Sequence, residues 1–464
     1  MTEKQVFHLI NRLSLGPNLE QIKQIENQGV DAYIQSQLQP QNLSYSADLK
    51  QKLQALDTLR LTPAQAFKER DRIKKTADDL KLSRQEKQKI RRKLEQKFLQ
   101  QARQGRLLLA LESPRPLEEV MVDFWYNHFN VFARKGEIAK LLFSSYEQLA
   151  IRPHVLGKFR KLLGATAHHP AMLYYLDNWQ NTDPKSKKAK GRFKGINENY
   201  ARELLELHTL GVDGGYSQQD VMELARILTG WGLPNNPKRS SDEDGFHFDR
   251  DRHDFTDKVF LGKAIKGRGI EEGEEALDLL ASHPSTAKFI SYKLAQLFVA
   301  DYPPESIVKK LSQRFLDTDG NIAAILKTLF QSDEFWDTQY YNTKFKTPYR
   351  YITSVMRGIG TVSNYQRIDG ILSQLGMPLY GCPTPDGYKN TQDAWLNPDT
   401  MIKRSSLSVP LSRGLLHDSK PVDADRLSQT LNGLLSANTR EVINNNPDNL
   451  KAALMLGSPE FMRY

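Results

Sequence analysis

Cysteine is almost absent from this chain of 464 residues, which contains only Cys382. One cysteine permits neither an internal disulfide nor a cysteine metal cluster. Long hydrophobic runs are also missing, because no apolar stretch approaches the roughly 18 residues that a membrane-spanning helix needs. The opening stretch, MTEKQVFHLINRLSLG, mixes charged residues into its apolar positions and so lacks the apolar core of a signal peptide. These absences predict a cytoplasmic protein without a transmembrane segment.

Several catalytic signatures are missing as well. The chain contains no GxGxxG, no GxxxxGK[ST], no GxSxG and no HExxH motif. These motifs serve dinucleotide binding, phosphate binding, serine hydrolysis and zinc-dependent proteolysis, respectively. The sequence therefore gives little support to nucleotide-driven, serine-hydrolase or zincin chemistry.

The composition is that of an ordinary globular protein. The hydrophobic share is 39% and the net charge is +10, so the chain can bury a large core and is longer than one core usually serves. We expect several packed regions. They are an N-terminal helical segment (residues 1–60), a basic helical arm (61–110), a helical core with the motif residues (111–340) and a C-terminal helical subdomain (341–464).

Helical periodicity dominates the pattern of apolar residues, which recur at steps of three and four. Serine precedes an acidic residue by three positions at Ser83–Glu86 and at Ser217–Asp220, which is typical of a helix N-terminal capping pair. Gly211 follows a helical run, where a left-handed C-terminal cap favours glycine. The sequence predicts a mainly α, multi-helical globular fold with at most a small β-hairpin, over residues 245–262.

The basic arm carries most of the excess charge. Residues Lys68–Arg106 contain fifteen Lys or Arg and six Asp or Glu, a balance of +9 of the total of +10. Such a stretch is either a solvated, inserted helical hairpin or a handle for an anionic partner. Its lack of interleaved aromatic residues argues against nucleic acid as that partner. A second basic stretch, Asp183–Gly195, is polar and glycine-containing and is predicted to be a loop.

The segment Asn197–Gly211 is the most chemically loaded helix. At about 100° per residue, Glu198, Asn199, Arg202, Glu203 and Glu206 fall within one arc, and His208 falls on the apolar side, where a core residue is typical. On a surface helix, this arc is an ordinary face with i,i+4 ion pairs. In a cleft, Glu198 and Glu203 could ligate a divalent cation or act as catalytic base, with Arg202 as an anion clamp and Asn199 orienting the substrate.

A second cluster lies in the apolar segment Asp123–Phe132. Polar groups in such surroundings must be paired if they are buried, so a satisfied core network is one interpretation. The other is a site at the end of the helix, with His128 as acid or base and Asn127 orienting the substrate.

Histidines in other segments complete the candidate set. His169 and His283 each precede a proline that opens a helix, so each ring could cap backbone amides or meet an anion. His253 beside Asp254 could be a poised base.

Many stretches together resemble the bacterial family known as domain of unknown function 1800. The stretches are HLINRLSLGP, FWYNHFNVF, IRPHVLGKFRKLL, HPAMLYYLDN, NENYARELLELHTLGVDGGYSQQDVMELARILTGW, HDFTDKVFLG, HPSTAKFISYKLAQLFVADYPP, TDGNI, KTPYRY, PTPDGYKN and SPEFMRY. The resemblance spans nearly the whole chain and implies a largely helical protein. Many members look secreted, and this chain departs from them in lacking an export signal. The polar motif positions carry over without a known role: Asn127, His128, His154, Asn197, Glu198, Asn199, Arg202, Glu203, His208, His253, Asp254 and His283.

We therefore expect the segments Asp123–Phe132 and Asn197–Thr209 to face each other across a cleft, joined by His154, His253, Asp254 and His283. The favoured function is a hydrolase- or transferase-like enzyme. Its catalytic residues would be His128, Glu198, Glu203, His253 and Asp254, and its substrate-binding residues Asn127, Asn199, Arg202, His154 and His283. A divalent metal ion at Glu198 and Glu203 is part of this hypothesis. The alternatives are a non-catalytic protein that binds an anionic partner through Lys68–Arg106 and, with less support, a protein with His-ligated haem or iron.

Overall fold

The mainly α prediction is confirmed by a computed structural model of the chain. It describes residues 2–234, 244–360, 362–417, 420–431 and 433–464. The model is 64% helical. No helix in the described ranges is long and apolar enough to cross a membrane.

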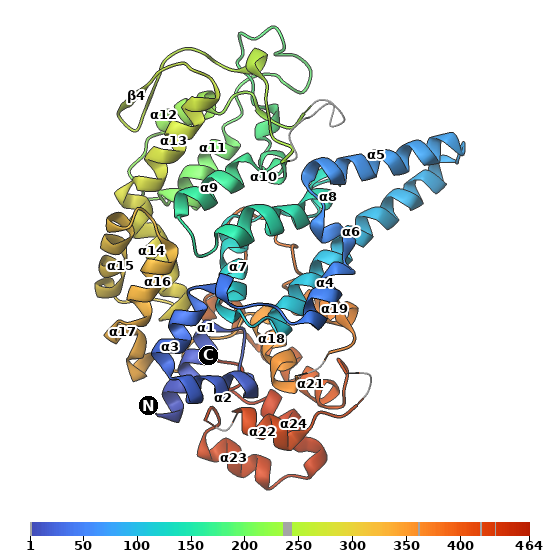
Figure 1. The fold of residues 1–464 in the computed structure, drawn as a ribbon, viewed down its shortest axis with the longest axis vertical. Coiled ribbons are helices and arrows are strands. Elements are labelled where there is room, and N and C mark those ends of the chain that lie inside the picture. Colours follow the sequence, from blue (N-terminus) through green and yellow to red (C-terminus); the bar gives the residue numbers. More distant parts are fainter. Residues whose placement is uncertain (1, 235–243, 361, 418–419, 432) are drawn as a thin grey trace.

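The N-terminal helices lie beside the C-terminal part of the chain (Figure 1). The first of them begins with a capping box. The Thr2 hydroxyl accepts a hydrogen bond from the Gln5 backbone N–H, and the Gln5 side-chain oxygen accepts one from the Thr2 backbone N–H. The helices are α1 (Glu3–Leu13), α2 (Leu19–Gln28), α3 (Val30–Gln37), η1 (Pro40–Asn42), α4 (Ala47–Gln54) and η2 (Asp57–Arg60).

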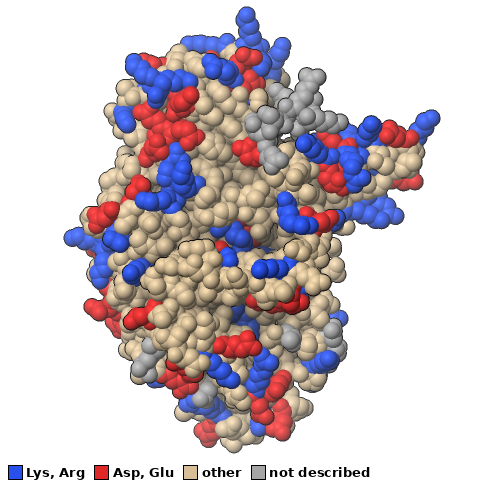
Figure 2. Space-filling model, in the orientation of Figure 1, with Lys and Arg blue, Asp and Glu red and all other residues tan. Residues whose placement is uncertain are grey.

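The basic arm is a helical hairpin that projects from the body (Figure 1). It consists of α5 (Pro63–Asp79) and α6 (Arg84–Glu112), and the capping box predicted at Ser83–Glu86 begins α6. The far ends of both helices are mostly exposed, whereas α6 becomes buried from Phe98 onward. Lys and Arg cover the hairpin, with Asp and Glu interspersed (Figure 2). Its base is therefore part of the core and its tip stands in solvent.

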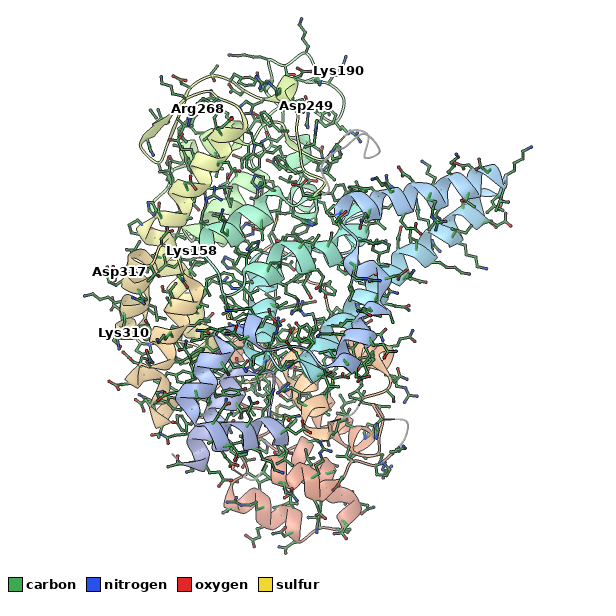
Figure 3. The ribbon with its side chains drawn as sticks, in the orientation of Figure 1. Lys158, Lys190, Asp249, Arg268, Lys310 and Asp317 are labelled. Carbon is green, nitrogen blue, oxygen red and sulfur yellow. The ribbon has the colours of Figure 1, made fainter. Side chains whose placement is uncertain are left out.

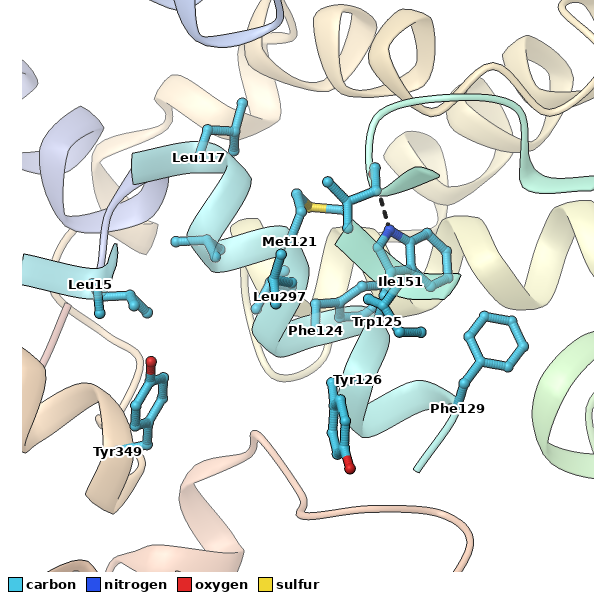
Figure 4. Packing of buried hydrophobic residues seen from close by; sticks show 14 of the residues in the cluster. Leu15, Leu117, Met121, Phe124, Trp125, Tyr126, Phe129, Ile151, Leu297 and Tyr349 are labelled. Atoms are coloured by element: carbon cyan, nitrogen blue, oxygen red, sulfur yellow. Dashed lines mark hydrogen bonds between the residues drawn. The ribbon is translucent and has the colours of Figure 1, made fainter. Parts of the chain in front are cut away.

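The centre of the molecule is built around α7 (Pro116–His128). Proline at the first helical position and two glutamates in the first turn favour the start of this helix. Trp125 is fully buried and donates from Nε1 to the Val155 carbonyl at 3.1 Å (Figure 4). The hydrophobic cluster to which it belongs runs from Val6 to Met462.

The remaining helices of the central region follow α7 along the chain. Two of them, η3 and η6, are single stretches of π-helix. The helices are α8 (Glu137–Ser145), η3 (Tyr146–Ile151), η4 (Arg152–His154), α9 (Phe159–His168), α10 (Pro170–Tyr175), η5 (Asn178–Gln180), α11 (Asn199–Glu203), η6 (Leu204–Thr209), α12 (Gln218–Ile227), η8 (Arg250–Arg252), α13 (Ile270–Ser282), α14 (Pro284–Phe298), α15 (Glu305–Asp317), α16 (Ile322–Phe330), α17 (Asp333–Trp336) and η9 (Thr338–Tyr340).

The β structure consists, in the described ranges, of two antiparallel pairs. Strand β1 (Trp231–Gly232) pairs with β2 (His247–Phe248), and β3 (Lys258–Phe260) pairs with β4 (Lys263–Ile265). The segment 245–262, expected to form a hairpin by itself, thus divides between two sheets, because each half finds its partner outside the segment. Lys190 and Asp249 lie at this end of the molecule (Figure 3).

The C-terminal helices pack below the centre in Figure 1. They are α18 (Pro348–Ile359), α19 (Tyr365–Gln374), α20 (Gln392–Trp395), α21 (Pro398–Ser412), α22 (Ala424–Leu431), α23 (Ala437–Asn444) and α24 (Asp448–Leu456). A loop over residues 380–390 leaves this region and reaches the end of α7. The domain boundaries expected from the sequence stay a prediction.

Candidate active site

Asn127, in the last turn of α7, holds the loop over residues 380–390. Its Nδ2 donates to the Asp123 carbonyl at 3.0 Å, and its Oδ1 accepts from the Tyr388 backbone N–H at 3.2 Å. Gly387 has φ +68°, and a Cβ there would lie 2.2 Å from the Asn127 carbonyl oxygen. The amide that the sequence assigned to substrate is therefore engaged with backbone, and it positions the loop.

His128, the next residue, is buried. Its Nε2 lies 3.0 Å from the His208 carbonyl oxygen, and since a carbonyl only accepts, Nε2 carries the proton. Its Nδ1 has no hydrogen-bond partner among the described residues. Burial, then the charge of Lys293 and His208, hold the pKa of His128 well below its ordinary value. The ring is neutral, with an unused lone pair on Nδ1.

His208 lies in the π-helical segment η6, which continues directly from α11. π-Helical turns occur mostly as single insertions and often at functional sites. The ring is buried, as the sequence predicted, and its Nε2 has no partner among the described groups. Burial, with a smaller contribution from Lys293, lowers the pKa of His208 to about 3. A second neutral imidazole thus adjoins the first, with ring centroids 6.2 Å apart.

Lys293, on α14, is the charged group common to both imidazoles. Its side chain is partly exposed, and its Nζ lies 5.3 Å from the centroid of the Phe289 ring. No hydrogen bond or ion pair within the described part of the chain engages this amine. Burial, then the charge of Lys389, lower the pKa of Lys293 to about 8, against an opposing effect of Asp386. With this pKa, roughly a tenth of the amine is deprotonated at pH 7, far more than for an ordinary lysine.

Glu203, at the end of α11, adjoins the same loop. Burial, then the charges of Glu206 and Asp386, raise the pKa of Glu203, while Arg202 opposes them. Asp386 thus acts on both Glu203 and Lys293 and is itself paired with Lys389 at 2.7 Å. The pKa values of these two groups are therefore shifted in opposite directions, upward for Glu203 and downward for Lys293.

We refer to His128, Glu203, His208, Lys293 and Asp386 as the Lys293 cluster. Its two imidazoles are buried, whereas Glu203, Lys293 and Asp386 are partly exposed. The cluster therefore combines polar groups that lack partners with access from solvent. Perturbed pKa values of this kind gather at functional sites.

The sequence matches one protein family over nearly its whole length. The model of a protein family of unknown function, DUF1800, matches residues 8–463. The chain belongs to the DUF1800 family. No curated protein and no solved structure matches this DUF1800 chain.

Elsewhere in the DUF1800 chain, Glu198, Arg202 and Glu206 form a surface ladder. Arg202 pairs with Glu198 at 3.2 Å and with Glu206 at 3.4 Å, which are the i,i+4 pairs expected for a solvated face. Gln218, on α12, bonds both Glu198 and Arg202. Glu198 is therefore paired with Arg202 and Gln218, whereas Glu203 is influenced by Asp386 of the loop over residues 380–390.

Asn199 is held by backbone. Its Nδ2 donates to the Leu176 carbonyl at 3.1 Å, and its N–H bonds the Asn197 side chain. The Asn197 N–H in turn donates to Asn181 Oδ1 at 2.9 Å. These amides attach the start of α11 to the preceding segments.

His253 and Asp254 belong to a separate buried network. His253 lies 3.0 Å from Glu272 through Nε2 and 2.8 Å from the Thr229 carbonyl through Nδ1. Glu272 also binds Lys258, and Asp254 pairs with Arg226 at 2.9 Å. Every one of these groups has a partner, so the network resembles a structural link between the small sheets and α13.

The two other histidines lie apart from the cluster. His283 caps α14, with Nδ1 accepting from the Ser285 N–H at 3.1 Å, and His169 caps α10 in the same way. Of the two interpretations of the His-Pro motifs, these contacts agree with capping of backbone amides. His154, in η4, is half-buried, and burial followed by the charge of Lys161 lowers its pKa.

A metal site finds no geometric support. Within the described ranges, no group of three or more His, Cys, Asp or Glu side chains is arranged to hold a metal ion. Glu198 is bound to Arg202 and Gln218 instead. A divalent cation at Glu198 and Glu203 would therefore lack a third His, Cys, Asp or Glu ligand among the described residues, and this part of the hypothesis stays a prediction.

Sequence reasoning missed Lys293 and Asp386. Both lie in stretches that carry the family resemblance, HPSTAKFISYKLAQLFVADYPP and PTPDGYKN. A lysine in an amphipathic helix and an aspartate in a loop are typical of ordinary surface residues. Their location in stretches that carry the family resemblance is the one feature of the sequence that could have indicated them.

Proposed function

We propose that this DUF1800 protein is a hydrolase- or transferase-like enzyme whose active site is the Lys293 cluster. The observation that supports this proposal is the Lys293 amine, which is partly exposed, lacks a hydrogen bond or ion pair within the described residues and has its pKa lowered to about 8. A general base is most effective when its pKa lies near the operating pH. The neutral amine would accept a proton from the attacking hydroxyl of water or of an acceptor substrate.

Glu203 is the matching proton donor in this proposal. Its raised pKa favours the protonated carboxyl, which can protonate a leaving group. His128, whose Nδ1 has an unused lone pair but is buried, would support the cluster from within the core. Asn127 is a positioning residue, because it fixes the loop that carries Asp386.

The first test needs no known substrate. We expect acetylation of Lys293 by an N-hydroxysuccinimide ester to reach its half-maximal rate near pH 8, whereas an ordinary lysine does so near pH 10.4. Lys288, an exposed lysine on the same helix, is the matched control. Peptide mass spectrometry between pH 6 and 11 gives both profiles. Coinciding profiles would remove the basis of the proposal.

The second test uses turnover. We expect Lys293→Met to abolish hydrolysis of any ester, amide or phosphate substrate that the wild type accepts, with the melting temperature retained. Lys288→Met should keep full activity. A large loss of stability in Lys293→Met, or retained turnover, would contradict a catalytic amine.

A second candidate function is binding of an anionic partner by the arm. A groove of about 510 Å³ lies along the hairpin between α5 and α6. Apolar residues such as Ile73 and Leu94 contribute to its lining, together with cations. The lining cations are Arg70, Lys74, Arg84, Lys87 and Arg91.

This alternative is tested by charge reversal. The whole of Lys68–Arg106 cannot be removed, because α6 carries Phe98 into the core. We expect the triple variant Lys74→Glu, Lys75→Glu and Arg84→Glu to elute from a heparin column at clearly lower salt than the wild type. The matched control reverses three exposed lysines outside the arm: Lys23, Lys309 and Lys403. Equal losses in both variants would indicate net charge alone and not a site on the arm.

A further inference from the structure

Two fully buried cations lie side by side in the C-terminal region. Lys346 precedes α18 and Arg404 lies in α21, and both are 0% exposed. Arg404 Nη2 donates to the Lys346 carbonyl at 2.7 Å, which places the two residues in contact. Lys346 Nζ and the Nε and Nη1 of Arg404 have no hydrogen-bond partner among the described residues.

Aromatic rings lie against these two cations. The Arg404 guanidinium lies 4.5 Å from the centroid of Phe345 and 4.9 Å from that of Tyr351. Lys346 Nζ lies 4.3 Å from the centroid of Phe461. Within the described ranges, no carboxylate forms an ion pair with either residue. The other charged group acting on Lys346 is Arg350, a third cation, and burial followed by Arg350 and Arg404 lowers the pKa of Lys346.

This arrangement is costly without a counter-charge. An isolated buried charge loses its hydration, and buried charges are normally paired. Lysine can lose its proton, but arginine stays charged in proteins. The aromatic faces compensate only in part, because a cation–π contact offers no acceptor to the N–H groups.

We propose that Lys346 and Arg404 form a buried binding site for a small inorganic anion. The unpartnered Nζ of one residue and the unpartnered Nε and Nη1 of the other supply the donors, and Phe345, Tyr351 and Phe461 supply the walls. The lack of carboxylate partners makes the site selective for negative charge. Chloride and phosphate share this chemistry, and the experiment distinguishes them.

The proposed anion site predicts that Lys346→Met lowers the melting temperature rather than raising it. Removing a buried amine that has no partner stabilises a protein or leaves it unchanged. If an anion is bound, Lys346→Met instead leaves that anion with half of its counter-charge, so the melting temperature falls. Lys403→Met, an exposed lysine beside Arg404, is the matched control and should change little.

The experiment measures the melting temperature of the full chain after unfolding and refolding in sodium chloride, sodium phosphate or sodium gluconate of equal ionic strength. We expect the temperature to rise with the logarithm of the concentration of chloride or of phosphate, but not of gluconate, a larger organic anion that serves as the reference. The slope should vanish in Lys346→Met and persist in Lys403→Met. Ion chromatography of the denatured, desalted protein should recover the bound anion.

The opposite results overturn the proposal. They are a melting temperature independent of the anion at constant ionic strength, no anion recovered from the wild type, or a Lys346→Met protein that is as stable as the wild type or more so. If Lys346→Met fails to fold, the wild-type anion dependence and the ion analysis still decide the question.

Discussion

Asparagine side chains in this protein link backbone segments that are distant in sequence. Asn130 donates to the carbonyls of Cys382 and Thr384 at 3.0 and 2.8 Å, across more than 250 residues. Asn127 makes the equivalent link to Tyr388. An amide both donates and accepts, so it can satisfy a backbone group that no helix provides for. Polar residues in an apolar segment therefore do indicate a hydrogen-bonded contact with a distant segment. Here the contact is made with backbone groups.

Gly387 is the partner of that link and gives a stability prediction. Gly387→Ala combines a left-handed backbone with a Cβ only 2.2 Å from the Asn127 carbonyl. We expect it to lower the free energy of unfolding by at least about 2 kcal/mol. Gly191→Ala is the control, because Gly191 has φ +63° with no atom within 4 Å of the added Cβ. It should lose about 1 kcal/mol. Equal losses in urea unfolding would show that the close approach to Asn127 is unimportant.

The buried histidines predict a loss of stability in mild acid. Burial lowers the pKa of His169 and of His208 to about 3, so these rings stay neutral in the native state but take up protons on unfolding below pH 6.5. The free energy of unfolding therefore decreases as the pH falls from 6.5, by up to about 1.4 kcal/mol per pH unit for each ring.

The measurement is the free energy of unfolding between pH 7 and 5, above the range in which most carboxylates titrate. His169→Asn keeps an acceptor for the Ala171 N–H that the ring caps but cannot take up a proton. Its pH slope should be shallower than that of the wild type. An unchanged slope would contradict the assignment to His169.

The hairpin of α5 and α6 behaves as two different parts. Its tip is largely exposed, whereas the rest of α6 packs into the core through Phe98, Ala102 and Leu107–Leu111. One helix therefore serves both as a solvent-exposed arm and as a core element. The transition occurs near Leu94, the first buried apolar residue of α6.

This division predicts the result of trimming the arm. Replacing residues 74–91 with a short Gly-Ser turn should leave the melting temperature nearly unchanged, because all of the removed side chains except Ala77 are exposed or half-buried and such residues contribute little to stability. Phe98→Ala should lower the free energy of unfolding by about 3–5 kcal/mol. Thermal unfolding by circular dichroism compares the two proteins. A trimmed protein that unfolds early would place part of the core in the tip.

Local signals in the sequence predicted much of the helical structure. The capping pairs at Ser83 and Ser217 are present, and Gly211 has φ +84° at the end of its helical run. The ion pairs of Arg202 with Glu198 and Glu206 follow from helical spacing alone. These features depend on residues within four positions of one another, which the sequence displays directly.

The candidate site depends on contacts that no local pattern contains. His128 meets the carbonyl of a residue 80 positions away, and the loop bonded to Asn127 comes from 261 positions away. The expectation that the segments of His128 and Glu203 lie against each other agrees with the contact of His128 with the His208 carbonyl, whereas a cleft between them stays a prediction. It could not place Lys293 beside them, nor show that Glu198 faces α12, because helix orientation is decided by packing.

The attachment of α1 to α18 constrains when the protein can reach its native state during synthesis. Arg350 Nη2 donates to the carbonyls of Asn11 and Ser14, which precede it by 339 and 336 positions. At a translation rate of about 5–20 residues per second, α1 waits roughly 20 to 70 s for that guanidinium to emerge from the ribosome. The part of α1 that α2 and α7 do not cover stays open throughout that interval, so expression at a slower elongation rate should increase the dependence of the nascent chain on holding chaperones.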